Sequence, residues 1–483
     1  MNLATLKEEW FSNVKGDVLA GITVALALIP EAIAFAIIAG VDPMVGLYAS
    51  FCIAVVIAFT GGRPGMISAA TGAMALLMIT LVKDHGIEYL FAATVLTGII
   101  QVLLGVLKVG RFITFLPQTV MIGFVNALAI LIFLAQLPHF AGASWIMYAM
   151  VAGTLAIIYL FPLITKAVPS PLVAIIIMTA AAIFGGLDLK TVGDMGEITK
   201  APPVFHIPMV EFSWETLMIV LPYSFPLAIV GILESLLTAT IVDEFTNTKS
   251  DKNREVKGQG IANIVTGFFG GMAGCAMIGQ SVINVKSGGS GRLSVLTAGT
   301  FLLFLIMVLG DIVTQIPMAA LVGVMIMVSV GTFDWQSIKD LKKYPLSDAV
   351  VMLLTVGVVV YTHNLALGVG LGVVLSALVF GWRMAQIKTS TVEKENVKIY
   401  TISGQLFFGT MTHFIDLFDY QHDPKTIHIN FTNSHVWDHS AVTAIAKVMQ
   451  KYKRYNKEVI VTGLNAESEH LINRIGLESV SGH

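Results

Sequence analysis

The chain has 483 residues, of which 55% are hydrophobic and only 12% are charged, and its mean hydropathy is +0.80. Because soluble proteins carry about 25% charged residues, this composition excludes a protein that is soluble over most of its length. The formal net charge is -2, and the charges cluster in loops and near the C-terminus, so no nucleic-acid partner is expected.

Apolar segments long enough to cross a bilayer recur between residues 17 and 384. The first begins near Val18 and is not followed by a small-residue cleavage site, which predicts a retained span rather than a signal peptide. Segments 66–83 and 276–290 are the weakest because they are short or rich in small residues. We predict fourteen spans, at 17–39, 43–60, 66–83, 88–107, 112–136, 144–163, 168–185, 214–242, 258–272, 276–290, 294–311, 317–332, 346–362 and 364–384.

The basic residues predict the orientation of these spans. With the N-terminus inside, the outward loops contain only Lys83, Lys190 and Lys200. An excess of lysine and arginine in the inward loops indicates that both termini are cytoplasmic and that the protein lies in the cytoplasmic (plasma or inner) membrane. The inward loops contain Lys7, Lys15, Arg63, Lys108, Arg111, Lys166, Lys249, Lys252, Arg254, Lys257, Lys286, Arg292, Lys339, Lys342, Lys343, Arg383 and Lys388.

The composition changes after residue 388, where a polar segment reads as a linker. Short alternating strands and amphipathic helices follow, which predict a small α/β domain with a mostly parallel sheet. The domain boundaries are therefore a transmembrane part at 1–388 and a cytoplasmic part at 395–483. Strands are predicted at 397–402, 405–408, 426–431 and 458–462, and helices at 413–419, 440–455 and 467–475.

Two carboxylates interrupt the apolar segments. Glu234 lies in the middle of the run 217–242, and Glu31 lies within the first run. An ionised side chain at bilayer depth costs at least about 2.5–3.5 kcal/mol, so such residues usually mark an ion or substrate path. One acid in each half of a membrane protein points to transport. The alternative is a structural role, which for Glu31 would be a hydrogen bond to a backbone group of a neighbouring helix.

Segments 66–80 and 274–284 read as broken helices. Each begins with small residues, passes a glycine and continues as a short helix, and the two lie at matching places in the two seven-span halves. Interrupted spans at matching places indicate a midplane site in an inverted-repeat transporter. Half-helix N-termini offer unpaired N–H groups and about half a positive charge, which suits an anion. The alternative is close packing of small residues between helices.

Three motifs together resemble the SulP family of anion transporters over essentially the whole chain. Glu234-Ser235-Leu236-Leu237-Thr238 resembles the acidic motif of the family's eighth span. The C-terminal segment, with Gly404-x-Leu406-Phe407-Phe408 and Asp438-x-Ser440, is similar to a STAS domain. The family's opening signature is matched by Asp17-x-x-Ala20-Gly21-x-x-Val24-Ala25-x-x-x-Ile29-Pro30-x-Ala32-x-Ala34-Phe35, followed by Ala39-Gly40-x-x-Pro43-x-x-Gly46-Leu47-Tyr48.

The resemblance implies an α-helical polytopic membrane protein with two inverted seven-span repeats, arranged as a core and a gate domain and followed by the STAS domain. It further implies a homodimer and an elevator-like movement of the core. The cation-linked acid falls on Glu234, with Thr238 one turn further along the helix. The anion site implied by the resemblance contains Glu31, Phe35, Thr71, Gly72, Ala73, Gly279, Gln280 and Ser281.

Two positions depart from the family pattern. Many members have glutamine where this chain has Glu31, and many have arginine where this chain has Gln280. Both changes remove positive potential from an anion site, and two carboxylates beside one anion repel it strongly at low dielectric. We therefore expect a cation to enter with the anion. Glu234 is the preferred cation site because Thr238 can add an oxygen ligand, whereas Glu31 could take either a proton or Na⁺.

The sequence therefore predicts cation-coupled transport of a small inorganic anion, sulfate or bicarbonate. Uncoupled anion exchange and dicarboxylate transport remain alternatives within transport, and a membrane-anchored STAS sensor or scaffold is the alternative outside it. No nucleophile–base pair, phosphate loop or metal-ligand cluster points to an enzyme, and no cofactor is expected beyond Na⁺ or H⁺. Cys52 and Cys275 lie in apolar sequence, which predicts buried free thiols.

Ser440 matches the position that is phosphorylated in some STAS relatives. Phosphorylation would place negative charge at a helix N-terminus, where it is tolerated. Capping of the predicted helix 440–455 by Asp438 or Ser440 explains the same residues, and we favour this second interpretation.

Overall fold

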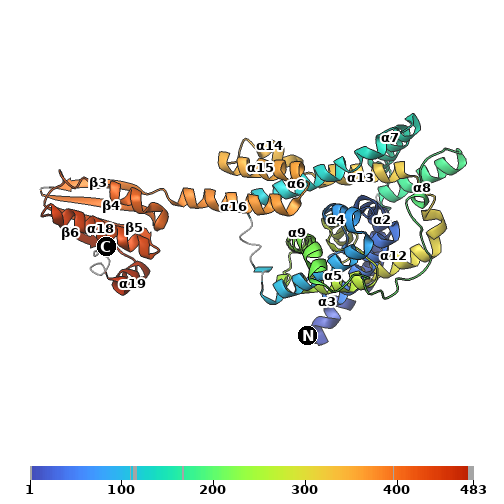
Figure 1. Ribbon diagram of the computed structural model, residues 1–483, viewed down its shortest axis with the longest axis horizontal. Helices are drawn as coiled ribbons and strands as arrows, with labels where there is room; N and C mark the ends of the chain where they lie inside the picture. Colours follow the sequence, from blue (N-terminus) through green and yellow to red (C-terminus); the bar gives the residue numbers. More distant parts are fainter. Residues whose placement is uncertain (1–2, 109, 112–116, 166–167, 395, 477–483) are drawn as a thin grey trace. The chain divides into compact units, whose positions relative to one another are not determined.

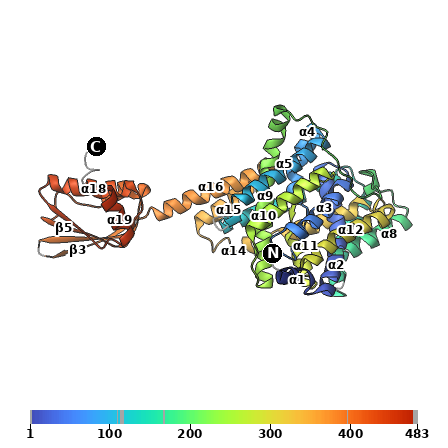
Figure 2. The ribbon, with the colours of Figure 1, turned by 90° about the horizontal axis from the view of Figure 1, so that it is seen from below.

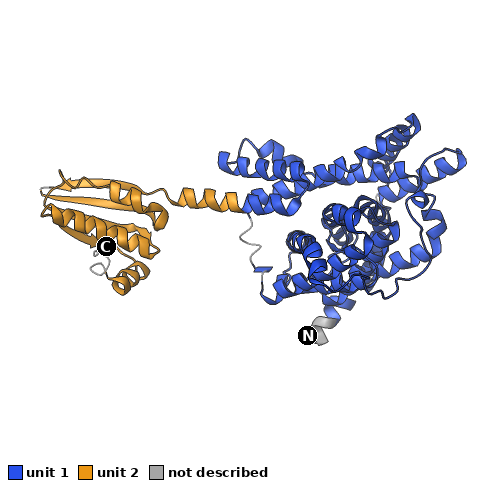
Figure 3. Ribbon diagram, in the orientation of Figure 1, with its two compact units in different colours: residues 1–373 blue, residues 374–483 orange. Residues whose placement is uncertain are grey.

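The structure of the protein is a computed structural model that describes residues 3–108, 110–111, 117–165, 168–394 and 396–476. Internal contacts divide the chain into two compact units, residues 1–373 and 374–483 (Figure 3). The start of the predicted span 112–136 and the predicted inward residue Lys166 lie outside the described residues.

The first unit is helical, and the prediction of a polytopic α-helical protein is confirmed. Within the described residues, nine helices are long and apolar enough to cross a membrane, and α8 and α15 are shorter apolar helices. A helix, or a short strand followed by a helix, lies at each place where a span is predicted, but the number of spans stays a prediction. The helices are α1 (Leu3–Phe11), α2 (Val14–Ala39), α3 (Pro43–Thr60), α4 (Gly72–His85), α5 (Ile87–Val106), α6 (Gln118–Leu134), α7 (Trp145–Leu160), α8 (Ser170–Phe184), α9 (Trp214–Thr246), α10 (Lys252–Phe268), α11 (Ile278–Lys286), α12 (Arg292–Val313), α13 (Met318–Thr332), α14 (Trp335–Asp340), α15 (Leu346–Thr362) and α16 (Leu365–Met384).

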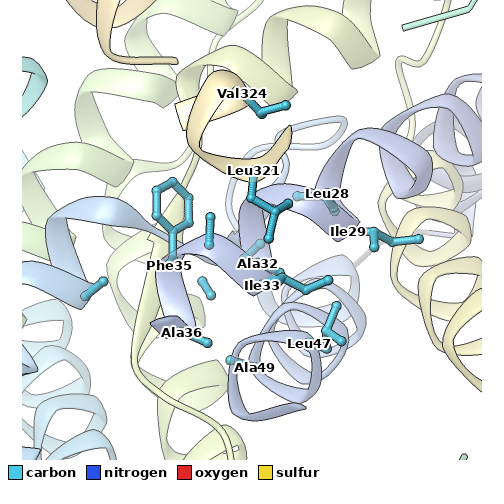
Figure 4. Close-up of a cluster of buried hydrophobic side chains, with 14 of the residues drawn as sticks. Leu28, Ile29, Ala32, Ile33, Phe35, Ala36, Leu47, Ala49, Leu321 and Val324 are labelled. Carbon is cyan, nitrogen blue, oxygen red and sulfur yellow. The ribbon is translucent and has the colours of Figure 1, made fainter. Parts of the chain in front are cut away.

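The helices of the first unit pack as two groups (Figures 1 and 2). In the first group, α5 packs along α10 and α9, and α3 packs between α10 and α12, while α2 packs on α12 and α3. In the second group, α6 packs against α13 and α15, and α7 packs against α13 and α8. The first group also contains α4 and α11. Figure 4 shows how α2 joins the groups: Phe35, Ala32 and Leu28 on α2 pack beside Leu321 and Val324 on α13.

Two short strands pair inside the first group. Strands β1 (Ser68–Ala70) and β2 (Gly274–Ala276) are antiparallel, with Ala69 opposite Cys275. Helix α4 begins two residues after β1, and α11 begins two residues after β2. The broken character predicted for 66–80 and 274–284 is therefore present as strand followed by helix. The Ser281 hydroxyl accepts a hydrogen bond from the Ile67 amide at 3.0 Å, which joins the start of α11 to the chain before β1.

The second unit carries a four-stranded sheet of order β3-β4-β5-β6. Strand β3 (Lys388–Lys394) is antiparallel to β4 (Val397–Leu406), whereas β5 (Thr426–Val436) and β6 (Glu458–Thr462) continue the sheet in parallel. Helices α17 (Met411–Asp416), α18 (His439–Arg454) and α19 (Ala466–Ile475) follow their strands. The predicted strand 397–402 and the first two residues of the predicted strand 405–408 belong to one strand, β4, and a short 3-10 helix begins at Phe408. The interpretation of the segment after residue 388 as a linker is wrong, because β3 lies there.

A buried carboxylate in the second unit connects strand, loop and helix. Asp423 is 5% exposed and accepts hydrogen bonds from Tyr400 at 2.7 Å and Tyr452 at 2.5 Å. Lys398 Nζ lies 2.6 Å from its other oxygen, and this hydrogen bond raises the pKa of Lys398. Because the pKa of this lysine is raised in the folded state, the stabilisation is complete below its ordinary pKa of about 10.4 and is lost only as the pH rises further.

Replacing Asp423 with alanine is expected to destabilise the second unit by about 3–5 kcal/mol, because it leaves a lysine and two buried hydroxyls without their partner. Thermal unfolding of the full chain in detergent, followed by near-UV circular dichroism, measures the loss. Asp416→Ala on α17 is the control, since Asp416 is exposed and such substitutions usually stay within about 0.5 kcal/mol. Equal stability of the two variants would contradict a structural role for this cluster.

Candidate functional site

A cavity of about 830 Å³ lies in the first unit, where the two helix groups face one another. Its walls come from α2, α4, α9 and α11 of the first group and from α6, α8 and α13 of the second. Seven of the residues predicted for the anion and cation sites line it: Glu31, Phe35, Thr71, Gly72, Glu234, Gly279 and Gln280. The structure therefore brings together residues that are up to about two hundred and fifty positions apart in the sequence.

Three predicted site residues do not line the cavity. Ala73 is fully buried on α4. Ser281 is also fully buried and is engaged with Ile67. The Thr238 hydroxyl donates to the backbone carbonyl of Glu234 at 2.7 Å, so its hydrogen atom is used within α9. The roles of these residues stay predictions.

The first turns of α4 and α11 open onto the cavity. The N–H groups of a helix's first turn have no partner within the helix, and they carry partial positive charge. A Cβ added at Gly279 would meet no atom within 4 Å, so a ligand can approach the backbone there. At Gly72 an added Cβ would lie 2.9 Å from the Phe35 ring, so the glycine lets that ring approach the start of α4. Both helix ends are thus available to a negatively charged group.

Glu31 lies on α2, which packs against α11 at the cavity wall. Pro30, the residue before it, lies inside the helix and has no backbone N–H to donate. The Gln280 side chain lies beside the Glu31 carboxyl group and interacts with it. Gln280 is 3% exposed, and its Oε1 atom has no hydrogen-bond partner among the residues that the structure describes. The acid of α2 is therefore placed beside the N-terminal turn of α11.

Glu234 lies on the part of α9 that contacts strand β2. Its Oε2 atom accepts a hydrogen bond from the Cys275 thiol on β2, with the two atoms 2.8 Å apart. The Cys275 sulfur is also 3.2 Å from Oγ1 of Thr71, the residue that precedes α4. On the next residue of each element, the Ala276 amide donates to the Ser235 hydroxyl at 3.1 Å. The acid of α9 is therefore attached to β2 and, through one thiol, to the start of α4.

The cavity wall carries more negative than positive charge. Glu31, Glu234 and Asp334 line it, and no lysine, arginine or histidine does so among the described lining residues. Asp334 uses its carboxylate to cap α14, accepting from the amides of Gln336 and Ser337 at 3.1 and 3.2 Å. Positive potential at this site thus comes from the two helix N-termini, whereas the side chains contribute carboxylates.

Two residues of the cavity region are missing from the sequence-based prediction. Cys275 reads from sequence as an ordinary buried thiol, and only the register of β1 with β2 places it between Glu234 and Thr71. Asp334 follows an apolar span and precedes Trp335, a pattern typical of a helix cap at a membrane surface, so the sequence carries no signal for its place in the cavity.

In the second unit, Asp438 caps α18. Its Oδ1 atom accepts from the Ala441 amide at 2.9 Å, and its Oδ2 atom accepts from the Phe408 amide at 2.9 Å. Asp438 is thus the capping residue, and Ser440 lies in the first turn of the helix. A regulatory role for Ser440 stays a prediction.

The family of the chain follows from comparison with known proteins. The Sulfate permease family model matches residues 14–159 and 143–355, and the STAS domain model matches residues 388–481. This chain belongs to the Sulfate permease family. Within the family, it is 60% identical over 475 residues to YbaR of Bacillus subtilis (strain 168), provisionally named a sulfate transporter, covering 98% of this chain and 99% of YbaR.

Other named proteins and solved structures are also similar to this chain. The bicarbonate transporter BicA of Picosynechococcus is 29% identical over 430 residues, which cover 81% of this chain and 75% of that one. The solved transmembrane domain of a cyanobacterial BicA superposes with a TM-score of 0.65 at 26% identity, covering 76% of this chain and 98% of that domain. Murine Slc26a9 gives a TM-score of 0.84 at 18% identity over 98% of this chain and 91% of its own, which shows a shared fold. The resemblance inferred from the sequence motifs is confirmed.

Proposed function

We propose that this protein is a secondary active transporter that moves a small inorganic oxyanion, sulfate or bicarbonate, together with Na⁺ or H⁺. The observation that carries the proposal is that two half-helix N-termini and two buried acids, Glu31 and Glu234, line one cavity. Family membership supports the same conclusion, since relatives are named for sulfate and for bicarbonate. A scaffold would have no use for this arrangement.

The charges of the cavity support coupling to a cation. An oxyanion at the first turns of α4 and α11 gains from N–H groups and helix dipoles. The same anion is repelled by any ionised carboxylate nearby, and this repulsion is large where the dielectric constant is low. A cation on Glu234 or Glu31 removes the repulsion, so anion and cation stabilise one another in the site. Thermodynamic linkage then requires each ion to raise the affinity for the other.

The two helix groups support an elevator mechanism. The first group contains both half-helices and both acids, and the second group supplies the facing wall through α6, α8 and α13. We propose that the first group carries the ions across the membrane by moving against the second. In this scheme both termini face the cytoplasm and two copies of the chain form a homodimer through parts that remain fixed.

The purified protein in proteoliposomes tests the proposal. We expect uptake of radiolabelled sulfate or bicarbonate into vesicles, and accumulation above equilibrium when an inward Na⁺ or pH gradient is imposed. Fumarate is the comparison substrate, and empty vesicles are the control. Uptake that exchanges anions but ignores both cation gradients would favour an uncoupled exchanger. Uptake of fumarate alone would favour a dicarboxylate carrier, and the absence of any flux would favour a STAS-based sensor or scaffold.

A further inference from the structure

One buried thiol connects the two ion sites. Cys275 is fully buried on β2, 2.8 Å from Glu234 Oε2 on one side and 3.2 Å from Thr71 Oγ1 on the other. Glu234 and Thr71 both line the cavity, whereas Cys275 does not. The thiol therefore lies behind the wall, between the candidate cation site on α9 and the anion-facing start of α4.

The number of protons in this chain of groups restricts the directions of its hydrogen bonds. A thiol has one hydrogen to donate, and an ionised carboxylate can only accept. When Glu234 is ionised, Cys275 must donate to Glu234, and the Thr71 hydroxyl must then donate to the Cys275 sulfur. In that state Thr71 has only oxygen lone pairs to offer toward the cavity, and these repel an anion.

We propose that Cys275 transmits cation binding at Glu234 to the anion site by turning its hydrogen from Glu234 to Thr71, which reverses the hydrogen bond between Cys275 and Thr71. A cation that neutralises Glu234 weakens the carboxylate as an acceptor for the thiol hydrogen. The S–H group then donates to Thr71 Oγ1. The Thr71 hydroxyl is released and donates into the cavity, to an anion at the start of α4. No covalent bond changes except the one that a proton would form with Glu234, if the proton is the coupling ion. This inference rests on the proposed cation-coupled transport.

The other charged groups around α9 do not take part in the hydrogen bonds from Glu234 through Cys275 to Thr71. Among the described residues of the elements that pack on α9, Cys275 on β2 is the titratable side chain with a hydrogen bond to Glu234. Glu31 and Asp334 are the other acids among the described residues of the same cavity wall. The acids and bases on the neighbouring helices have partners elsewhere, are exposed or lie at helix ends. Glu88 pairs with His206, Glu255 binds the amides of Gly62 and Arg63, and Lys252 pairs with Asp243. Lys286 lies over Phe245, Arg254 lies near Thr60, Lys257 is exposed, and Lys83, Asp84 and His85 end α4.

A purely structural role for Cys275 predicts a different result. The β1–β2 pairing and the hydrogen bond from Ala276 to Ser235 hold β2 in place without the thiol. If Cys275 only fills space, its removal lowers stability or the maximal rate of transport equally at every cation concentration. If it transmits cation binding, its removal changes how the KM for the anion depends on the cation. The cation dependence of KM is therefore the decisive measurement.

The experiment compares Cys275→Ala, Cys275→Ser and Cys52→Ala with the wild-type protein in proteoliposomes. The KM for radiolabelled sulfate, or for bicarbonate if only that anion is taken up, is measured at low and high Na⁺ and at two pH values. Coupling between two ligands is typically worth a factor of at least about five in affinity. We expect the wild-type KM to fall by at least about fivefold at high coupling cation. The Cys275→Ala KM should fall by a clearly smaller factor, because only the direct repulsion between the carboxylates and the anion then couples the two ions.

The other variants fix the interpretation. Cys275→Ser keeps one donor and two acceptors, so it should restore the cation dependence of KM. Cys52 is buried on α3 and does not line the cavity, so Cys52→Ala should behave as wild type. A Cys275→Ala protein that keeps the wild-type cation dependence of KM would overturn the inference and leave coupled transport standing. If Cys275→Ala does not fold, a Cys275→Ser protein without cation dependence would overturn it instead. A wild-type KM independent of both cations would overturn coupling and this inference together.

Discussion

Replacing Glu234 with glutamine is expected to abolish cation-driven accumulation of the anion. Glutamine keeps the shape of the side chain and an oxygen that can accept from Cys275, but it carries no charge for a cation to neutralise. The cavity then loses one source of repulsion, so the anion can bind and equilibrate without a companion ion. In proteoliposomes with an inward Na⁺ or pH gradient, uptake by the variant should stop at the equilibrium level, and the cation dependence of KM, at least about fivefold in the wild type, should disappear.

The same helix provides a matched control for this substitution. Glu244 lies on α9 ten residues further along and is exposed outside the cavity, so Glu244→Gln removes the same charge from the same helix without touching the site. It should accumulate anion as the wild type does. Glu31→Gln tests whether the second acid takes part, because it removes the charge of that side chain and keeps its shape. A Glu234→Gln protein that still accumulates anion with unchanged Na⁺ and pH dependence would show that the coupling role is wrong.

The position of Glu234 could be predicted from the sequence because burying a charge in lipid costs free energy whatever the neighbouring residues are. An acid in the middle of an apolar run is a local signal, and the structure places it on α9 with 8% exposure and on the cavity wall. Thr238 is one turn away on the same helix, yet its hydroxyl is bonded to the α9 backbone. A hydroxyl on a helix can always make that local bond, and the sequence does not reveal the choice.

The contacts of Cys275 and the far wall of the cavity depend on non-local pairing. Cys275 reaches Glu234 and Thr71 only through the register in which β2 meets β1, more than two hundred residues earlier in the chain. Such register is not encoded in composition or periodicity. Helices α6, α8 and α13 show apolar patterns typical of spans, and nothing in those patterns indicates which face lies on the cavity.

Strand β3 is missing from the sequence-based prediction because its sequence is interpreted as a linker. Its sequence is polar, and six of its seven residues are exposed, because it lies at the edge of the sheet and pairs only with β4. A polar edge strand protects a sheet from pairing with other chains, and from sequence it looks like a linker. Strand β5 alternates over its first six residues between buried and half-buried residues, and β6 alternates between exposed and half-buried residues. This alternation is visible in the sequence, and both strands begin at the predicted residue.

Replacing Gly274 with alanine is expected to produce a large loss of stability in the first unit. A Cβ at this position would lie 2.1 Å from the Ala69 carbonyl oxygen and 2.5 Å from the Ile53 side chain. The backbone of Gly274 is also held by two hydrogen bonds to Asn263, at 2.9 and 3.1 Å. Neither β1 nor β2 can move away without breaking these contacts, so the cost should reach or exceed the upper end of the usual range for overpacking, about 3 kcal/mol.

The apparent Tm of the detergent-solubilised protein, followed by intrinsic fluorescence, measures this effect, and Gly357→Ala is the matched control. Gly357 lies within α15, where an added Cβ meets no atom within 4 Å, so alanine should be neutral or raise stability by up to about 1 kcal/mol through helix propensity. A Gly274→Ala protein that melts like the wild type would mean that β1 and β2 can separate at little cost. The pairing of β1 with β2 would then be too weak to hold Cys275 within hydrogen-bonding distance of both Glu234 and Thr71. Stable pairing of the two strands is therefore a condition for the thiol to connect the two ion sites.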